Sequence, residues 1–72
     1  MRINGEALRA IRERTGFSIS ELSRESGVDR TVITRIETGE RRGTHAQHKA
    51  LAVALGVSLL AIALTNPDGE VA

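Results

Sequence analysis

The sequence contains no cysteine, tryptophan or tyrosine, and it has one proline and one phenylalanine among 72 residues. The absence of cysteine excludes disulfide bonds and thiolate metal sites. A domain of this size buries only about 60% of the surface that its unfolded chain exposes. Its stability must therefore come from a well-packed apolar core or from a partner subunit. The scarcity of aromatic residues, which favour strands, argues against a β-sheet protein.

Long apolar runs are also missing. The longest, from Val57 to Leu64, is interrupted by Ser58 and is far shorter than the roughly 20 residues that a membrane-spanning helix needs. The sequence does not open with the charged leader and apolar run that are typical of a secretory signal. We therefore expect a cytoplasmic protein with no membrane partner.

The formal net charge of the whole chain is +1, but its end is acidic. Without Asp68 and Glu70 the balance is 10 basic against 7 acidic residues, or +3. All basic residues except Lys49 are arginines, whose rigid fork of donors suits phosphate groups and guanine. A preference for arginine over lysine is also typical of a GC-rich coding sequence, so charge alone leaves nucleic-acid binding open.

Apolar residues recur at helical spacing, which predicts five helices and no strands. Two helix starts are marked by capping boxes, in which the first and fourth residues bond each other's backbone N–H. These are Ser18 with Glu21 and Thr44 with Gln47. The predicted helices, with their caps, run from Asn4 to Gly16, Ser18 to about Ser26, Asp29 to Gly39, Thr44 to Gly56, and Ser58 to about Thr65.

The end of the chain is rich in residues that break helices. Residues 66–69 read Asn-Pro-Asp-Gly, a cluster that ends regular structure. We therefore expect one domain over residues 1–65, and a flexible tail or the start of a linker over residues 66–72.

The segment from Ser18 to Gly39 has the layout of a helix-turn-helix, with a short helix, a glycine turn and a second helix. Its second half, GVDRTVITRIETG over residues 27–39, closely resembles the turn and recognition helix of the phage-repressor and Cro-like (XRE-type) family. Residues 9–17 resemble the first helix of that family, and residues 50–60 resemble its fourth helix and the cap of its fifth. The resemblance implies an all-α fold, a compact five-helix bundle of the lambda-repressor-like DNA-binding type.

The resemblance also implies a function, which is sequence-specific binding of double-stranded DNA by a transcriptional regulator, most often a phage or bacterial repressor. The third helix is then expected in the major groove, where side chains near its N-terminus meet base edges. The expected base-contacting residues are Arg30, Thr31, Thr34 and Arg35. Phosphate contacts are expected from Ser18, Arg14, Arg41 and Arg42.

Arg12 and Glu37 are implied by the resemblance to form a structural ion pair between the first and third helices. The chain departs from the family pattern at Ile19, where many relatives have a phosphate-binding glutamine, and at Glu40, where lysine is frequent. We therefore expect phosphate binding to be redistributed over other residues.

His45 and His48 stand where apolar residues are common in the family, so the resemblance does not predict the packing at the start of the fourth helix. Two histidines without further ligands do not make a metal site, and we expect no metal or other cofactor.

The predicted fifth helix is apolar almost all round, whereas a helix on a small domain needs one apolar stripe. We expect Leu59 and Ile62 to pack on the core, and Leu60 and Leu64 to form the contact of a homodimer on a near-palindromic operator. A C-terminal domain absent from this chain would cover the same surface.

No motif predicts an enzyme, because the sequence has no glycine-rich phosphate loop and too little chain to enclose a substrate. Two alternatives to a repressor stay open. One is the antitoxin of a toxin-antitoxin pair, which also binds a protein partner. The other is a protein-interaction module that uses the same bundle without DNA.

Overall fold

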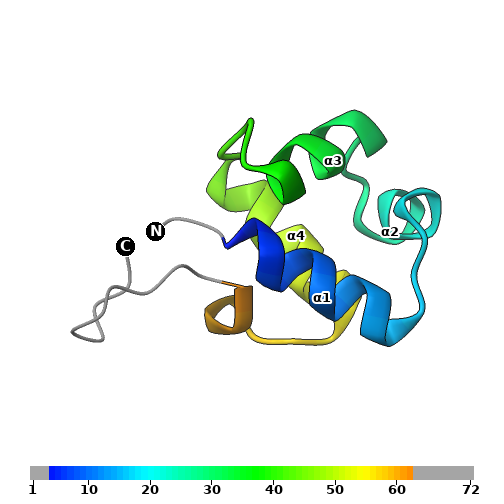
Figure 1. The fold of residues 1–72 in the computed structure, drawn as a ribbon. Coiled ribbons are helices and arrows are strands. Elements are labelled where there is room, and N and C mark those ends of the chain that lie inside the picture. Colours follow the sequence, from blue (N-terminus) through cyan, green and yellow to red (C-terminus); the bar gives the residue numbers. More distant parts are fainter. Residues whose placement is uncertain (1–3, 63–72) are drawn as a thin grey trace.

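The structure, a computed structural model, describes residues 4–62, which form four α-helices and one short 3-10 helix (Figure 1). The α-helices are α1 (Gly5–Thr15), α2 (Ile19–Ser26), α3 (Arg30–Thr38) and α4 (His45–Leu55), and the 3-10 helix is η1 (Leu59–Ile62). α2 packs against α3 and α4, α1 packs against α3 and α4, and η1 lies against α1 and α4. No strand occurs in residues 4–62, as the sequence predicts.

The α-helices begin at the caps identified in the sequence. The Asn4 side chain accepts a hydrogen bond from the Ala7 N–H, and Asp29 accepts one from the Thr31 N–H. Both capping boxes form, with N–O distances of 2.9–3.1 Å. Local side-chain chemistry therefore sets the start of every α-helix in the described part of the chain.

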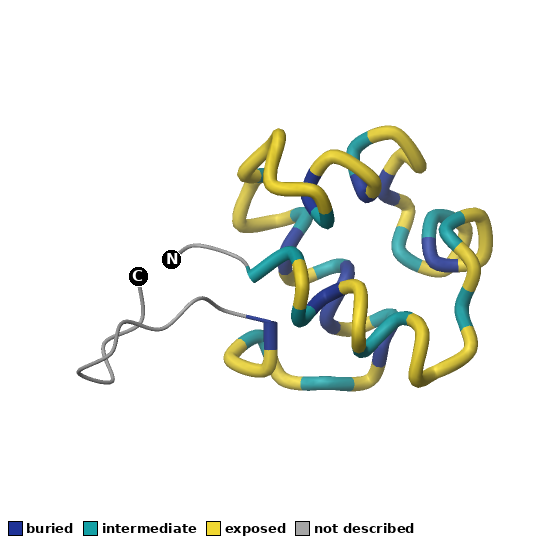
Figure 2. The backbone as a smooth tube through the Cα atoms, viewed as in Figure 1, coloured by how far each residue is buried: buried dark blue, intermediate teal, exposed yellow. Residues whose placement is uncertain are grey.

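Every helix contributes buried residues to the core, as the dark blue segments of Figure 2 show. Each α-helix turns one mainly apolar stripe inward, which is the pattern that helical spacing predicts, and α4 adds the buried His48. The buried apolar residues are Leu8, Leu22, Val28, Ile33, Ile36, Leu51, Ala52, Leu55 and Ile62.

The prediction of a fifth α-helix is wrong for the part that the structure describes. Leu59–Ile62 is a 3-10 helix, in which the Ala61 N–H bonds to the Ser58 carbonyl three residues back. The Ile62 carbonyl accepts a hydrogen bond from the Asn4 backbone N–H at 2.6 Å. A longer helix would use this carbonyl as an acceptor for its own backbone, whereas here a tertiary contact occupies it.

The inward residues of η1 agree with the prediction, because Ile62 is buried and Leu59 packs on the core. Leu60 is 63% exposed. Leu64 and the tail predicted at 66–72 lie outside the described residues. None of the helices formed by residues 4–62 combines the length and the apolar character needed to cross a membrane.

Candidate nucleic-acid interface

The turn between α2 and α3 is held by a buried side chain and by two serines. Val28 is buried, its carbonyl accepts a hydrogen bond from the Ser23 hydroxyl at 2.6 Å, and its N–H donates to Ser26 Oγ. Gly27 has φ +76°, a left-handed conformation that glycine adopts without a steric penalty. These contacts fix how α3 is presented relative to α2.

One face of α3 is buried and the other is open to solvent. Ile33 and Ile36 point into the core. All four residues predicted to contact bases are exposed. They line a single open hollow, and we call them the recognition surface: Arg30, Thr31, Thr34 and Arg35.

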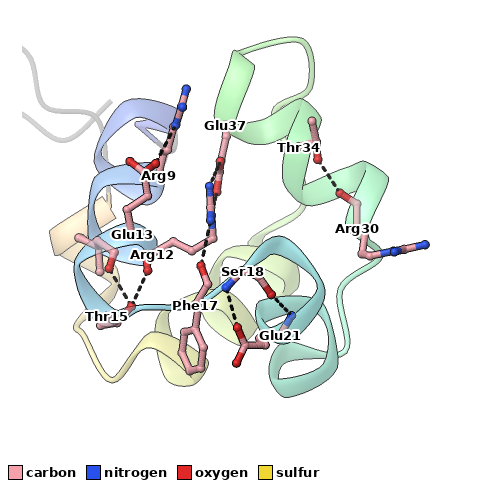
Figure 3. Close-up of polar contacts among 11 residues, drawn as sticks. Arg9, Arg12, Glu13, Thr15, Phe17, Ser18, Glu21, Arg30, Thr34 and Glu37 are labelled. Atoms are coloured by element: carbon pink, nitrogen blue, oxygen red, sulfur yellow. Dashed lines mark hydrogen bonds and ion pairs between the residues drawn. The ribbon is translucent and has the colours of Figure 1, made fainter.

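Hydrogen bonds within the domain organise part of the recognition surface. The Thr34 hydroxyl donates to the Arg30 carbonyl at 3.0 Å (Figure 3). Arg30 Nη1 also donates to Ser20 Oγ of α2 in a long contact of 3.4 Å. The Thr34 oxygen lone pair and methyl group, and most of the Arg30 donors, stay available to a ligand.

Three further residues line the same hollow: Ile19, Ser20 and Glu40. Ile19 and Glu40 are identified in the sequence only as departures from the family pattern. Ser20 was not predicted, and no local signal marks it, because its place beside Arg30 depends on how α2 crosses α3.

An ion pair links α3 to α1 (Figure 3). Arg12 Nε and Nη2 donate to the two carboxylate oxygens of Glu37 at 2.7 and 3.1 Å, and the side chains are 12% and 6% exposed. The hydrogen bond to Glu37 raises the pKa of Arg12. Arg12 Nη1 also donates to the Phe17 carbonyl at 2.9 Å, so one guanidinium group joins α1, α3 and the segment that leads into α2.

The residues predicted to contact phosphates are all exposed and lie outside the lining of the hollow. Ser18 caps α2, Arg14 lies near the end of α1, and Arg41 and Arg42 lie in the segment between α3 and α4. The structure thus gathers the predicted base-contacting residues at one place and distributes the predicted phosphate-contacting residues over three segments.

The capping box of α2 limits the hydrogen bonds that Ser18 can make with a ligand. Its N–H bonds to the Glu21 carboxylate and its Oγ accepts the Glu21 N–H, both at 3.0 Å. Hydrogen bonds from the backbone N–H and the hydroxyl of Ser18 lower the pKa of Glu21. A carboxylate therefore lies at the helix N-terminus where a phosphate is expected.

The two histidines have different environments. His45 is exposed, whereas His48 is 3% exposed and its Nε2 lies 2.6 Å from the Arg42 carbonyl oxygen. His48 thus occupies a core position with a hydrogen-bond partner. In the part of the chain that the structure describes, no three His, Cys, Asp or Glu side chains come together as a metal site would require.

The two short helices, the glycine turn between them and the open outer face of α3 define a helix-turn-helix domain. The helix-turn-helix domain family matches residues 5–64, and the chain belongs to this family, as the resemblance predicts.

Solved structures of regulators share the fold. The restriction-modification controller protein C.AhdI from Aeromonas hydrophila is similar with a TM-score of 0.77 and 32% identity, over 79% of this chain and 86% of that one. A hypothetical transcription factor, NHTF, from Neisseria has a TM-score of 0.77 and 30% identity, over 89% of this chain and 72% of that one. SinR, a master regulator for biofilm formation solved in complex with DNA, shares the fold at 24% identity, with a TM-score of 0.74 over 79% of this chain and 95% of that one.

A protein of Thermococcus kodakarensis whose name describes it as an HTH-type transcriptional regulatory protein is 46% identical over 41 residues. This match covers 57% of the present chain and 13% of the relative, so the chain corresponds to a small part of that protein.

Proposed function

We propose that this chain binds double-stranded DNA sequence-specifically and represses transcription. The observation that carries the proposal is the recognition surface, where two arginines and two threonines stand on the open side of α3. A helix of this kind fits the major groove of B-DNA and presents its first turns to the base edges. The controller protein that is 32% identical to this chain supports a regulatory role.

Each residue of the recognition surface brings chemistry that suits a base edge. Arg30 and Arg35 can each donate two parallel hydrogen bonds to O6 and N7 of guanine. Thr31 and Thr34 offer a hydroxyl oxygen and a methyl group, which suit an adenine or cytosine amino group and the thymine methyl. One good bidentate contact discriminates between bases by about 1–3 kcal/mol.

Phosphate contacts in this proposal come from groups outside the recognition surface. Arg41 and Arg42 supply charge from the segment after α3, and Arg14 supplies it from α1. The Ser18 hydroxyl would turn from the Glu21 carboxylate to a phosphate as a neutral donor. Such contacts orient the protein on the duplex and carry no direct sequence information.

The proposal includes a two-fold homodimer on a near-palindromic operator, with Leu60 and Leu64 in its contact. Leu60 is 63% exposed although it lies between the inward residues Leu59 and Ile62, so η1 presents an apolar side chain that the described core does not cover. A second copy would cover it and would join two weak half-site interactions into one useful affinity.

The test is selection of bound duplexes from a random DNA pool, followed by titration of the selected and of scrambled duplexes at several salt concentrations. We expect a two-fold-related consensus and an affinity that falls steeply with salt, because phosphate contacts release counterions. Enrichment of no sequence, together with no binding at low salt, would refute DNA recognition and favour a protein-interaction module.

A further inference from the structure

The segment that joins α3 to α4 is short and exposed at its two arginines. We call residues 40–43 the basic loop: Glu40, Arg41, Arg42 and Gly43. Its first anchor is the Arg41 N–H, which donates to the Arg35 carbonyl of α3 at 3.1 Å. Its second anchor is the Arg42 carbonyl, which is bonded to His48 of α4 at 2.6 Å.

The hydrogen-bond direction at the second anchor follows from chemistry. A carbonyl oxygen only accepts, so Nε2 of His48 must carry a hydrogen and donate it. The ring is 3% exposed, and this bond gives a buried donor its partner. The bond also fixes the peptide plane after Arg42, and with it the direction in which the chain presents that residue.

The backbone of the basic loop approaches the histidine ring closely. Gly43 has φ +76°, and a Cβ atom at this position would lie 3.1 Å from His48 Nε2 and 2.8 Å from Ile36 Cδ1. The left-handed conformation favours glycine here, and the two short distances show that the ring and Ile36 pack directly against the backbone of the loop. The ring thus lies between the core and the basic loop.

We propose that His48 is a positioning residue for DNA binding, which holds the basic loop so that Arg41 and Arg42 are presented to the phosphates beside the recognition surface. This inference rests on the proposed function. A loop that is already ordered loses less conformational freedom on binding, so its phosphate contacts form at a smaller entropic cost. An apolar residue, which is common at this place in the family, would fill the core but could not bond the Arg42 carbonyl.

The first test compares His48→Leu with His48→Gln in DNA titrations over a range of salt concentrations. Leucine keeps a buried apolar side chain without a donor, whereas the glutamine amide nitrogen keeps a donor near the position of Nε2. We expect His48→Leu to lose affinity roughly three- to tenfold for selected and scrambled duplexes alike, the size expected for ordering one or two side chains. Its slope of log K against log salt should fall by about one for each phosphate group that the variant no longer binds. His48→Gln should restore both the affinity and the slope.

The same change is then made in a chain that carries Arg41→Ala and Arg42→Ala. In that background His48→Leu should not weaken DNA binding further, because the arginine side chains that it positions are already absent. An equal loss of affinity in both backgrounds, or an unchanged salt slope in His48→Leu, would show that the histidine supports only the fold. Parental affinity and slope in the Arg41→Ala, Arg42→Ala chain would also overturn the inference.

A measurement on the unmodified chain without DNA covers the case in which His48→Leu does not fold. Imidazole nitrogen NMR should show a hydrogen on Nε2 of His48, and backbone relaxation should show residues 41–43 to be as ordered as α3. A ring protonated only on Nδ1, or loop amides much more mobile than the helices, would overturn the inference. This result is independent of the proposed function, which fails separately if the unmodified chain binds no DNA.

Discussion

Arg12 and Glu37 are 25 positions apart in the sequence and form a bidentate ion pair at 2.7 and 3.1 Å. Their side chains are 12% and 6% exposed, so the two charges are largely removed from water. Removal of one partner from such a pair leaves the other charge buried without compensation, which lowers the stability of the folded state. The pair also connects the helix that carries the recognition surface to α1.

We expect Glu37→Ala to lower the free energy of unfolding by more than about 2 kcal/mol. The matched control is Glu13→Ala, which breaks the exposed Arg9–Glu13 pair of α1, where the side chains are 64% and 57% exposed at an N–O distance of 3.6 Å. Exposed pairs contribute little, so the control should lose no more than about 0.5 kcal/mol. Chemical denaturation of both variants measures the difference, and equal midpoints would show that burial of the Arg12–Glu37 pair has no energetic consequence.

Gly5 marks a close approach between the start of α1 and the end of α3. A Cβ atom at this position would lie 2.6 Å from the Glu37 carbonyl oxygen and closer still to that of Ile36. In an open helix, alanine is preferred over glycine by about 1 kcal/mol. We expect the opposite sign here, with Gly5→Ala less stable than the parent by about 1–3 kcal/mol because the two backbones must separate.

Thermal unfolding of Gly5→Ala is compared with that of Glu6→Ala, which alters the next, exposed residue of α1. Only the first variant should show a clear drop in melting temperature. A gain in stability for Gly5→Ala would mean that α1 and α3 are not in close contact at this point.

The features that could be predicted from the sequence are those encoded by residues close together in the chain. The capping boxes of Ser18 and Thr44 use partners three residues away, and both form as expected. Apolar spacing likewise predicts the inward faces, such as Ile33 and Ile36 of α3. The Arg12–Glu37 pair followed only from family resemblance, because its partners meet through packing.

The features that could not be predicted depend on how elements meet in space. The hydrogen bond from Asn4 to the Ile62 carbonyl joins distant parts of the chain, and it accompanies a 3-10 helix where an α-helix was expected. Ser20 reaches the recognition surface only because α2 crosses α3. The sequence marks His48 only as a departure from the family pattern, and its carbonyl partner is revealed only by the fold.

The Glu21 carboxylate provides a prediction about pH. Hydrogen bonds from the Ser18 N–H and hydroxyl lower the pKa of Glu21 from its ordinary value of 4.5. A group whose pKa is lower in the folded state stabilises the fold above its unfolded pKa, and this contribution is lost as the pH falls through the folded pKa. The stabilisation by Glu21 should therefore be complete above about pH 4.5 and should decline below it.

NMR titration of the Glu21 carboxyl group should give a midpoint below 4.5, and Ser18→Ala should raise it because the hydrogen bond from the Ser18 hydroxyl is removed. Glu21→Gln keeps an acceptor for the Ser18 N–H but does not titrate, so its stability should fall less than that of the parent on acidification. A titration midpoint at or above 4.5 in the parent would contradict the capping-box explanation.

Arg35 and Arg41 allow base reading to be separated from phosphate binding. The two residues are neighbours, since the Arg41 N–H bonds to the Arg35 carbonyl, but Arg35 lines the recognition surface and Arg41 does not. Arg35→Ala should relax preference at one base position per half-site, with a discrimination loss of about 1–3 kcal/mol. Arg41→Ala should weaken binding almost equally on all sequences and reduce the salt slope by about one.

Titrations of both variants on the selected operator, on single-base variants of it and on scrambled DNA provide the measurement. Each arginine serves as the control for the other, because both changes remove the same charge. Equal reductions in affinity on selected and scrambled DNA for Arg35→Ala would remove this residue from base recognition.

The dimer is tested at Leu60, because this exposed side chain of η1 is the described part of the proposed contact. A glutamate placed in an apolar dimer contact must be buried or must separate the subunits, so Leu60→Glu should be monomeric at concentrations where the parent is a dimer. The control is Val53→Glu, which places the same charge on another exposed apolar residue, 72% exposed on α4; this variant should stay dimeric. Sedimentation of all three proteins, with and without operator, measures the assembly.

On DNA, two-fold pairing should place the recognition helices about 34 Å apart, one turn of the duplex. Leu60→Glu should then occupy single half-sites with much lower affinity than the parent, because separate monomers rather than one dimer would bind the two half-sites. A parent that stays monomeric at high concentration and fills one half-site at a time would refute the dimer.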